Sequence, residues 1–183
     1  MARTITIKTG GGGAYSPGWH ELTISKAKYS DYEGTKCIDI WFEGYPDNFN
    51  ARVYEKMGKN GEEFAIGQVF RFANAGITGS LDGPDKTMMI KIDDSAEALV
   101  DCKVNAYFYK DGEYSRCLKQ FAPTIFKNDV EEFKENDVIY WKSKAEKYYM
   151  EYVKDNTATT DNTFVSPTES DTSTGVTSDD IPF

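Results

Sequence analysis

The chain is poor in the residues that build metal and disulfide sites. It contains three cysteines and one histidine among 183 residues. Cys37, Cys102 and Cys117 are isolated from one another and odd in number, so their spacing indicates neither disulfides nor a structural zinc site. His20 stands next to Trp19, and we expect it to be structural rather than catalytic. The sequence therefore predicts no metal, no cofactor and no disulfide.

The chain also lacks an excess of basic residues and long apolar runs. Lys and Arg number 21 against 30 Asp and Glu, which gives a formal net charge of -9. Duplex-DNA binders are usually strongly basic, so this balance argues against that class. It remains compatible with a local basic strip among stacking aromatics, the mode used on single strands. Without a signal peptide or an apolar run that could span a bilayer, we expect a cytoplasmic protein with no membrane partner.

Sequence patterns of enzyme active sites are missing as well. We find no nucleophile–base motif, and the carboxylates are not grouped as a metal-dependent nuclease requires. The four glycines at 10–13 are not followed by Gly-Lys-Ser or Gly-Lys-Thr, so they predict a flexible N-terminal arm over residues 1–17 rather than a phosphate-binding loop. The chain is therefore not expected to be an enzyme. An enzyme of nucleic-acid metabolism would reveal itself by metal-dependent turnover.

What the sequence does contain is β-type alternation over residues 18–153, which we expect to form one domain. Strands are expected at residues 18–29, 36–42, 49–57, 87–92, 99–109 and 113–121. In the strand 99–109, one face is expected to carry Val100, Cys102, Val104, Ala106 and Phe108. In the strand 36–42, Ile38, Ile40 and Phe42 share the core face, so Trp41 should point away from the core. The domain is thus expected to be mainly β, with a few helices.

Helices and turns are expected between these strands. Residues 62–75 have helical spacing and end before Gly76, a typical C-cap. Residues 78–85 are expected to form a loop, and Asp111-Gly112 predicts a tight hairpin. An amphipathic helix at 135–153 offers a face to the domain or to a second subunit, so a homodimer is one expectation.

The C-terminal segment, residues 154–183, differs in composition from the rest. It carries six acidic residues against one lysine and has little apolar content, so we expect a disordered tail. Its end nevertheless offers an aromatic anchor beside a cluster of carboxylates, which fits a pocket on another protein. The expected partner-binding residues are Asp179, Asp180, Ile181, Pro182 and Phe183.

This tip resembles the acidic C-terminal tip of bacterial single-stranded DNA-binding proteins, which ends in Asp residues followed by Ile-Pro-Phe. Residues 18–123 resemble, more diffusely, phage-encoded single-stranded DNA-binding proteins with an oligonucleotide/oligosaccharide-binding (OB) fold. The resemblance implies a five-stranded Greek-key barrel with a helix between strands three and four and a ligand face on strands two and three. It also implies that the tip recruits replication, recombination and repair proteins in the cytoplasm of a bacterial host. The alternative fold is a generic α+β domain with the same elements.

Outward aromatic and basic residues of the expected strands are the candidates for binding single strands. Bases stack on the aromatic rings, at about 1–3 kcal/mol each, while Lys and Arg pair with phosphates. The alternative is ordinary packing, for example of Tyr107 or Tyr109 against the C-terminal helix. The candidate DNA-binding residues are Trp41, Arg52, Tyr54, Lys56, Tyr107, Tyr109, Lys110, Tyr114, Arg116 and Lys119.

The sequence thus predicts a protein that coats and protects single-stranded DNA without sequence specificity and recruits partners through its tip. The acidic tail is also expected to compete with DNA for a basic groove. A second hypothesis is a non-DNA interaction module that mimics the tip and competes for host replication and repair proteins.

Overall fold

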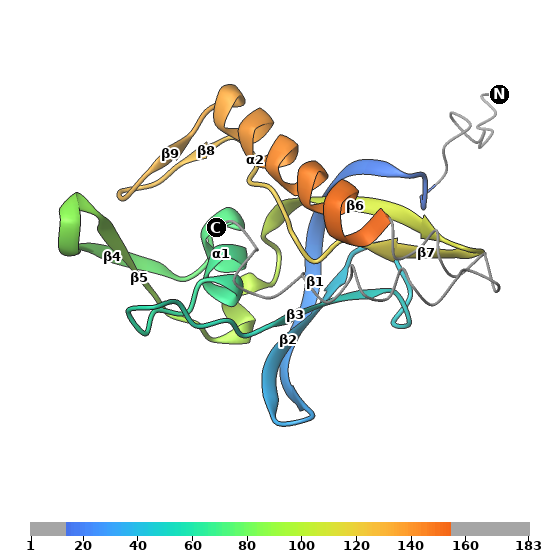
Figure 1. Ribbon diagram of the computed structural model, residues 1–183, viewed down its shortest axis with the longest axis horizontal. Coiled ribbons are helices and arrows are strands. Elements are labelled where there is room, and N and C mark those ends of the chain that lie inside the picture. Colours follow the sequence, from blue (N-terminus) through green and yellow to red (C-terminus); the bar gives the residue numbers. More distant parts are fainter. Residues whose placement is uncertain (1–13, 155–183) are drawn as a thin grey trace, which may run out of the picture.

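A five-stranded antiparallel sheet, ordered β3-β2-β1-β6-β7, forms the centre of the protein (Figure 1). The computed structural model describes residues 14–154. The sheet strands are β1 (Gly18–Tyr32), β2 (Thr35–Phe42), β3 (Asn50–Tyr54), β6 (Lys103–Asp111) and β7 (Tyr114–Cys117). Two further hairpins pair β4 (Ile77–Asp82) with β5 (Met88–Ile92) and β8 (Phe126–Lys127) with β9 (Glu132–Phe133). The helical elements are α1 (Ala65–Phe72), α2 (Glu135–Tyr148), the π-helical turn η3 (Tyr149–Val153) and the short 3-10 turns η1 (Pro84–Lys86) and η2 (Ala96–Leu99).

Strand β1 is shared by both halves of the sheet. Its first half pairs with β6, from Gly18 opposite Phe108 to Thr23 opposite Lys103, and its second half pairs with β2. A bulge between Ile24 and Lys26 separates the two halves. One inserted residue reverses which side chains face the core. Before the bulge, the even-numbered Leu22 and Ile24 point inward; after it, the odd-numbered Ala27 and Tyr29 do so.

The core lies between the inner face of the sheet and α1. Ile38, Ile40, Phe42 and Phe108 are all at most 1% exposed. Helix α1 contributes Ile66, Val69, Phe70 and Phe72 to the same cluster. The Glu63 carboxylate accepts hydrogen bonds from the backbone N–H groups of Ala65, Ile66 and Gly67 (each 2.8 Å), which satisfies donors that the first helical turn leaves unpaired.

The C-terminal helix packs along one side of this domain (Figure 1). Val138 and Ala145 of α2 are buried, and the Trp141 ring lies 4.9 Å from the ring of Phe72 in α1. The turn η3 continues the helix over β6. The amphipathic pattern predicted for 135–153 therefore covers the protein's own sheet and α1.

Several sequence predictions about the core are confirmed. Ala51 and Val53 face inward on β3, and Ile38, Ile40 and Phe42 do so on β2. A helix does follow the third strand, and the turn at Gly112 does join two paired strands. The protein is mainly β, as expected.

Other boundaries differ from the predictions. The helix predicted for 62–75 is limited to α1, because residues 58–63 form a turn closed by the bond from the Gly58 N–H to the Glu62 oxygen (2.7 Å). Residues 78–85, predicted as a loop, contribute to β4. That strand pairs only with β5 and has no buried residue, so no apolar alternation marks it in the sequence.

The strand predicted for 99–109 begins late, at Lys103. Leu99 lies in η2, Val100 is exposed, and Asp101 has a positive φ of 67° while its N–H donates to the Ile24 oxygen (2.8 Å). The chain therefore turns before it enters the sheet. Val100 leaves the predicted inward row, whereas Cys102 packs against the core as expected. The return strand is also shorter than predicted: β7 ends at Cys117.

The predicted closed barrel is not present. Strands β3 and β7 are the two edges of the five-stranded sheet and do not pair with each other. Helices α1 and α2 and the segment 118–122 stand beside this opening instead. In the described part of the chain, no helix combines the length and the apolar character needed to cross a membrane.

The N-terminal boundary also differs from the expected arm. Tyr15 packs edge-on against Tyr45 and Phe49, with ring centroids 5.3 and 5.2 Å apart, and the Tyr45 hydroxyl donates to the Ala14 oxygen (2.6 Å). Residues 14–17 are thus attached to the domain. Residues 1–13, the tail from residue 155 and its tip lie outside the described residues.

We predict that Gly76→Ala destabilises the fold by about 3 kcal/mol. Gly76 has a φ of +65°, and a Cβ there would overlap the carbonyl oxygen of Asp93, which the start of β4 cannot avoid. Gly34→Ala is the matched control, because Gly34 has a φ of +81° with open space around its Cβ position. It should cost about 1 kcal/mol. Urea unfolding measures both, and equal losses would contradict the packing argument.

Candidate nucleic-acid interface

One side of the sheet, opposite the core, gathers aromatic and basic side chains from three adjacent strands. Residues that pair across antiparallel strands share a face, so the register assigns them directly. Lys26 lies beside Trp41 and Asn50, Lys28 beside Asp39 and Arg52, and Ser30 beside Cys37 and Tyr54. We refer to these nine residues as the β1–β3 face. It carries three cations and one carboxylate, although the whole chain is acidic.

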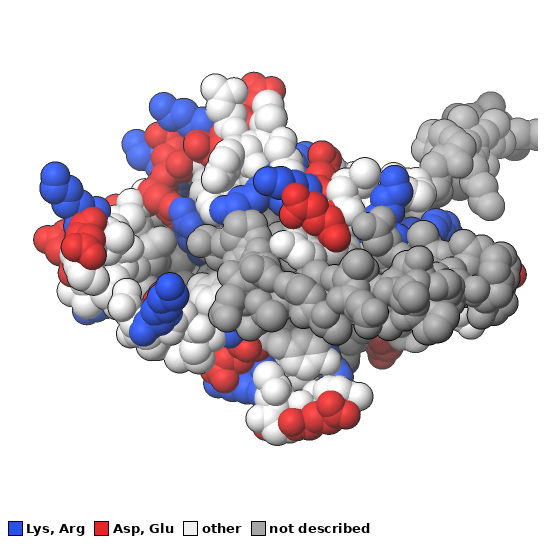
Figure 2. Space-filling model, viewed as in Figure 1, with Lys and Arg blue, Asp and Glu red and all other residues white. Residues whose placement is uncertain are grey.

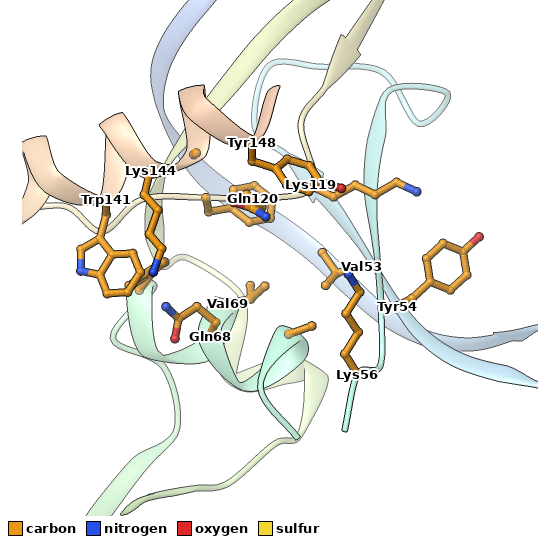
Figure 3. Close-up of a pocket in the computed structure, with 14 residues that line it drawn as sticks. Val53, Tyr54, Lys56, Gln68, Val69, Lys119, Gln120, Trp141, Lys144 and Tyr148 are labelled. Carbon is orange, nitrogen blue, oxygen red and sulfur yellow. The ribbon is translucent and has the colours of Figure 1, made fainter. Parts of the chain in front are cut away.

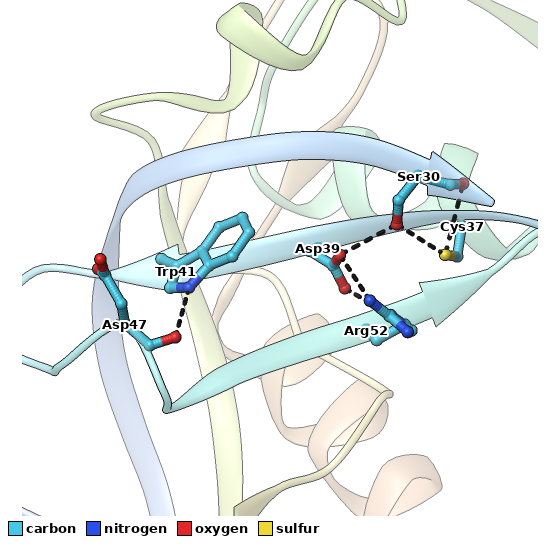
Figure 4. A network of polar contacts seen from close by, with 6 residues as sticks. All are labelled: Ser30, Cys37, Asp39, Trp41, Asp47 and Arg52. Atoms are coloured by element: carbon cyan, nitrogen blue, oxygen red, sulfur yellow. Dashed lines mark hydrogen bonds and ion pairs between the residues drawn. The ribbon is translucent and has the colours of Figure 1, made fainter. Parts of the chain in front are cut away.

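The single carboxylate of this face is held by its neighbours (Figure 4). The Asp39 carboxylate accepts three hydrogen bonds. Two are donated by Arg52, from Nε (2.7 Å) and Nη2 (2.9 Å), and one is donated by the Ser30 hydroxyl (3.0 Å). These bonds from Arg52, together with that from Ser30, hold the pKa of Asp39 below its ordinary value in spite of its burial. Asp39 therefore stays ionised and its charge is neutralised locally.

Three aromatic side chains on or beside the face, the half-buried Trp41 and Tyr54 and the exposed Tyr32, each have a cation against the ring. The Lys26 Nζ is 4.2 Å from the centroid of Trp41, and the Lys119 Nζ is 4.9 Å from that of Tyr54. Arg52 lies 5.6 Å from the ring of Tyr32, at the end of β1. The Trp41 indole N–H donates to the Asp47 oxygen (2.9 Å), which fixes the orientation of the ring (Figure 4). The face thus presents π surfaces and positive charges at the same places.

The opening between β3 and β7 contains a pocket of about 180 Å³ (Figure 3). Its walls come from β3, α1, the segment 119–121 and α2. Lys56, Lys119 and Lys144 contribute ammonium groups, and the lining includes no acidic residue. Tyr54 belongs to the β1–β3 face as well as to this lining, and Lys119 of the lining lies against its ring, so the face and the pocket are continuous.

The positive charges at the pocket lie close enough to affect one another. Burial, and then the charge of Lys119, lowers the pKa of Lys56. Burial, and then the charge of Arg52, lowers the pKa of Lys119. An anion bound between these lysines would raise both lowered pKa values, because a nearby negative charge favours the charged form of each lysine.

The structure brings together half of the predicted DNA-binding residues. Trp41, Arg52 and Tyr54 lie on the β1–β3 face, while Lys56 and Lys119 line the adjoining pocket. Arg52, however, uses two of its nitrogens on Asp39. Arg52 therefore has two structural roles, since it neutralises Asp39 and lies against the ring of Tyr32. Its charge is only partly available to a ligand.

Two predicted residues lie under the C-terminal helix. The rings of Tyr107 and Tyr109 are each 5.2 Å from that of Tyr149 in η3, and Trp19 packs on Tyr107 at 5.3 Å. Burial raises the pKa of both tyrosines. Their ring contacts are thus the packing contacts that the sequence left as the alternative, and η3 covers part of each ring.

The remaining three predicted residues gather at the tip of the β6–β7 hairpin, which points away from the β1–β2 hairpin in Figure 1. Lys110 donates to Ser115 (2.8 Å) and Arg116 to Asp111 (2.8 Å), while Tyr114 is 70% exposed. The hairpin is therefore a separate surface.

The sequence reasoning missed Lys26 and Lys28 on the face and Lys144, Trp141 and Tyr148 at the pocket. The two lysines were hidden by the bulge, because the alternation of Leu22 and Ile24, continued past residue 25, places them inside. Because lysines are rarely buried in an apolar core, their charge alone indicated that the alternation of inward and outward residues is reversed after residue 25. The pocket residues of α2 have no signal in the sequence, since only packing decides which side of a half-buried helix lies at an opening.

The charges on the face of the molecule seen in Figure 2 are mixed. Figure 2 shows acidic and basic side chains interspersed over the visible face, rather than one field of a single sign. Among residues 14–154, no group of three or more His, Cys, Asp or Glu side chains is arranged to hold a metal ion. His20 stacks on Phe108 (4.3 Å) and bonds the Ser16 oxygen (2.6 Å), a packing role. The arrangement suits non-covalent binding of a ligand with aromatic rings and negative charges.

Comparison with known proteins does not extend these observations. No protein-family model, no curated protein and no solved structure matches the chain.

We predict that Asp39→Asn lowers the free energy of unfolding by about 1–3 kcal/mol at pH 7, because charge-assisted bonds to Arg52 are lost. In the wild type this contribution is present above pH 4 and disappears as the pH falls through the lowered native pKa, since the unfolded state then binds more protons than the native state. Urea unfolding between pH 2 and pH 7 tests both statements. Asp82→Asn, an exposed position on β4, is the control. A constant difference between wild type and Asp39→Asn at every pH would show that the pair does not act as described.

Proposed function

We propose that the protein binds single-stranded DNA along the β1–β3 face and coats it without sequence specificity. The observation that carries this proposal is the pairing of half-buried aromatic rings on one sheet face with neighbouring cations: Trp41 with Lys26 and Tyr54 with Lys119. Single-strand binders combine the same two groups, rings for bases and cations for phosphates.

The architecture supports the proposal at the level of the fold. The OB fold is a five-stranded and partly open Greek-key barrel, and it binds oligonucleotides on its second and third strands and adjoining loops. Here five strands form one sheet, α1 follows the third strand, and the sheet is open between β3 and β7. The aromatic–basic face lies on β2 and β3, with the second half of β1 beside them.

Binding would exchange partners that the free protein already has. A base can stack on Trp41 when Lys26 moves from the ring to a phosphate, and the same exchange applies to Tyr54 and Lys119. Because every base has a π-face, this contact does not discriminate among sequences. The Asp39–Arg52 pair keeps the middle of the face rigid and limits its net repulsion of phosphates.

The overall negative charge sets conditions on this binding. Long-range attraction to DNA is weak for a chain of net charge -9, so the local cations must supply the phosphate contacts. Each phosphate contact on a single strand contributes about 0.7 to the slope of log affinity against log salt. We therefore expect a salt dependence that corresponds to a few contacts only.

In this proposal the tail serves partner recruitment. Asp179, Asp180, Ile181, Pro182 and Phe183 offer two side-chain carboxylates, an aromatic anchor and a terminal carboxylate to replication, recombination and repair proteins. The same charges allow the tail to compete with DNA for the β1–β3 face.

We predict that Tyr54→Ala weakens binding of a thirty-residue oligo-dT by about 1–3 kcal/mol, the value of one base stack. Lys28→Ala should lower the salt slope by about 0.7. Lys91→Ala on β5 and Tyr114→Ala at the hairpin tip are the controls, and both should bind like wild type. Fluorescence anisotropy gives the affinities, and quenching of tryptophan fluorescence reports bases close to Trp41 or the other tryptophans.

A duplex of equal length should bind much more weakly than oligo-dT. If the wild type binds neither nucleic acid by fluorescence quenching or anisotropy, the proposal is wrong. In that case, partner binding that depends on the tail would favour the interaction module that mimics the tip.

We further predict that a chain ending at Ser178 binds oligo-dT as tightly as the full chain or more tightly, because a competing anion is removed. Partner capture by the full chain should be lost in the same variant. Anisotropy at low and high salt measures the first effect, which should shrink as salt screens the tail. Markedly weaker DNA binding by the shortened chain would rule out competition by the tail.

A further inference from the structure

The pocket between β3, α1 and α2 has a shape and chemistry that flat stacking on the β1–β3 face does not require. We propose that it receives one pyrimidine base of the bound strand, with the phosphate next to that base held by the lysines at its mouth. This inference rests on the proposed function and adds to it a defined subsite with a preference for base size.

The volume of the pocket favours a single ring. An apolar cavity of about 150 Å³ holds benzene, and pockets for drug-sized ligands begin at about 300 Å³. With about 180 Å³, the pocket accommodates a six-membered pyrimidine more closely than the two fused rings of a purine. Its limits are set by the core side chains Val69 and Phe72 and by Val53 of β3, which cannot withdraw without disturbing the core.

The lining combines apolar walls with a few polar groups, as expected of a ligand site. Aromatic side chains Trp141 and Tyr148 border it from α2, and Phe121 closes it from the segment after β7. The side-chain amides of Gln68 and Gln120 lie in the lining and can donate to and accept from the edge of a base. The Gln68 oxygen accepts a bond from Arg71 (3.3 Å), so its NH2 group supplies the donors there.

Charge at the mouth favours a ligand that carries a phosphate. Lys56, Lys119 and Lys144 stand around the opening, and no lining residue is acidic. In Figure 3, Lys144 extends down from α2 and Lys119 extends toward Tyr54. A nucleotide brings a negative charge beside its ring, which matches the positive charge of Lys119 and Lys144 at the pocket.

The position of the pocket connects it with the face. Tyr54 belongs to both surfaces, and Lys119 lies against its ring while lining the pocket. A strand that stacks one base on Tyr54 therefore has its neighbouring base at the pocket mouth. The second cavity is lined by three carboxylates, those of Glu55, Glu63 and Asp94, against one cation, Lys36, and is therefore less suited to a phosphate.

The test fills the pocket and compares two oligonucleotides. Ala65→Leu in the full chain adds a larger side chain at the pocket wall, and Ala96→Leu in η2 is the matched control, because both alanines are half-buried against the same core. Wild type and Ala96→Leu should bind thirty-residue oligo-dT more tightly than oligo-dA. Ala65→Leu should lose about tenfold in affinity for oligo-dT and keep its affinity for oligo-dA, so that the ratio between them falls.

The outcomes separate this inference from the proposed function. If wild type binds neither oligonucleotide, both fail. If Tyr54→Ala weakens oligo-dT binding but Ala65→Leu binds both oligonucleotides like wild type, only the pocket proposal is overturned. Equal losses for oligo-dT and oligo-dA would also overturn it, because they indicate a general disturbance of the fold.

The acidic tip of the chain is the alternative occupant of the pocket. The variant Ala65→Leu also distinguishes between the tip and a base. Ala65→Leu is measured again in a chain that ends at Ser178. A base in the pocket predicts the same tenfold loss in both lengths of chain. A change in affinity that appears in the full chain but not in the shortened one would show that the pocket acts through the terminus, and the proposal would be wrong.

Discussion

The bulge in β1 is the constraint on which the rest of the structure depends. One strand must pair with β6 through its first half and with β2 through its second half, and the inserted residue between Ile24 and Lys26 lets it bend between the two. The same insertion changes the phase of the side chains. Without it, Lys26 and Lys28 would point into an apolar core, and the β1–β3 face would lose two of its three cations.

The unpaired edges of β3 and β7 have consequences of their own. A closed barrel would bury the space between these strands, but here α1, α2 and the segment 118–122 surround it and leave a pocket. Exposed edges invite association, and packing helices beside them is one way in which proteins protect them. The helix beside the opening continues into η3, whose Tyr149 packs on Tyr107 and Tyr109, so the same packing forms a pocket and partly covers two aromatic side chains.

The argument for an anionic ligand depends on the local distribution of charge and not on the net charge of the chain. The chain is acidic overall, yet the β1–β3 face and the pocket gather five lysines and one arginine around a single carboxylate that is already bonded. Cations placed over aromatic rings keep those rings partly covered in the free protein. In the proposed function, the free energy of binding is therefore a difference between two sets of favourable contacts, which makes the binding reversible.

The sequence by itself determined the mainly β class, the inward rows of β2 and β3, the helix after the third strand and the turn at Gly112, because alternation, capping and turn chemistry are local properties. It also sufficed to place Trp41, Arg52 and Tyr54 on the outward side of β2 and β3, since these two strands alternate without interruption. Only the tertiary structure decided the phase of Lys26 and Lys28, the cover over Tyr107 and Tyr109, and the pocket at the sheet opening. A bulge, a helix docking and an unpaired edge depend on contacts between residues far apart in the chain, and the periodicity of a single segment carries no record of them.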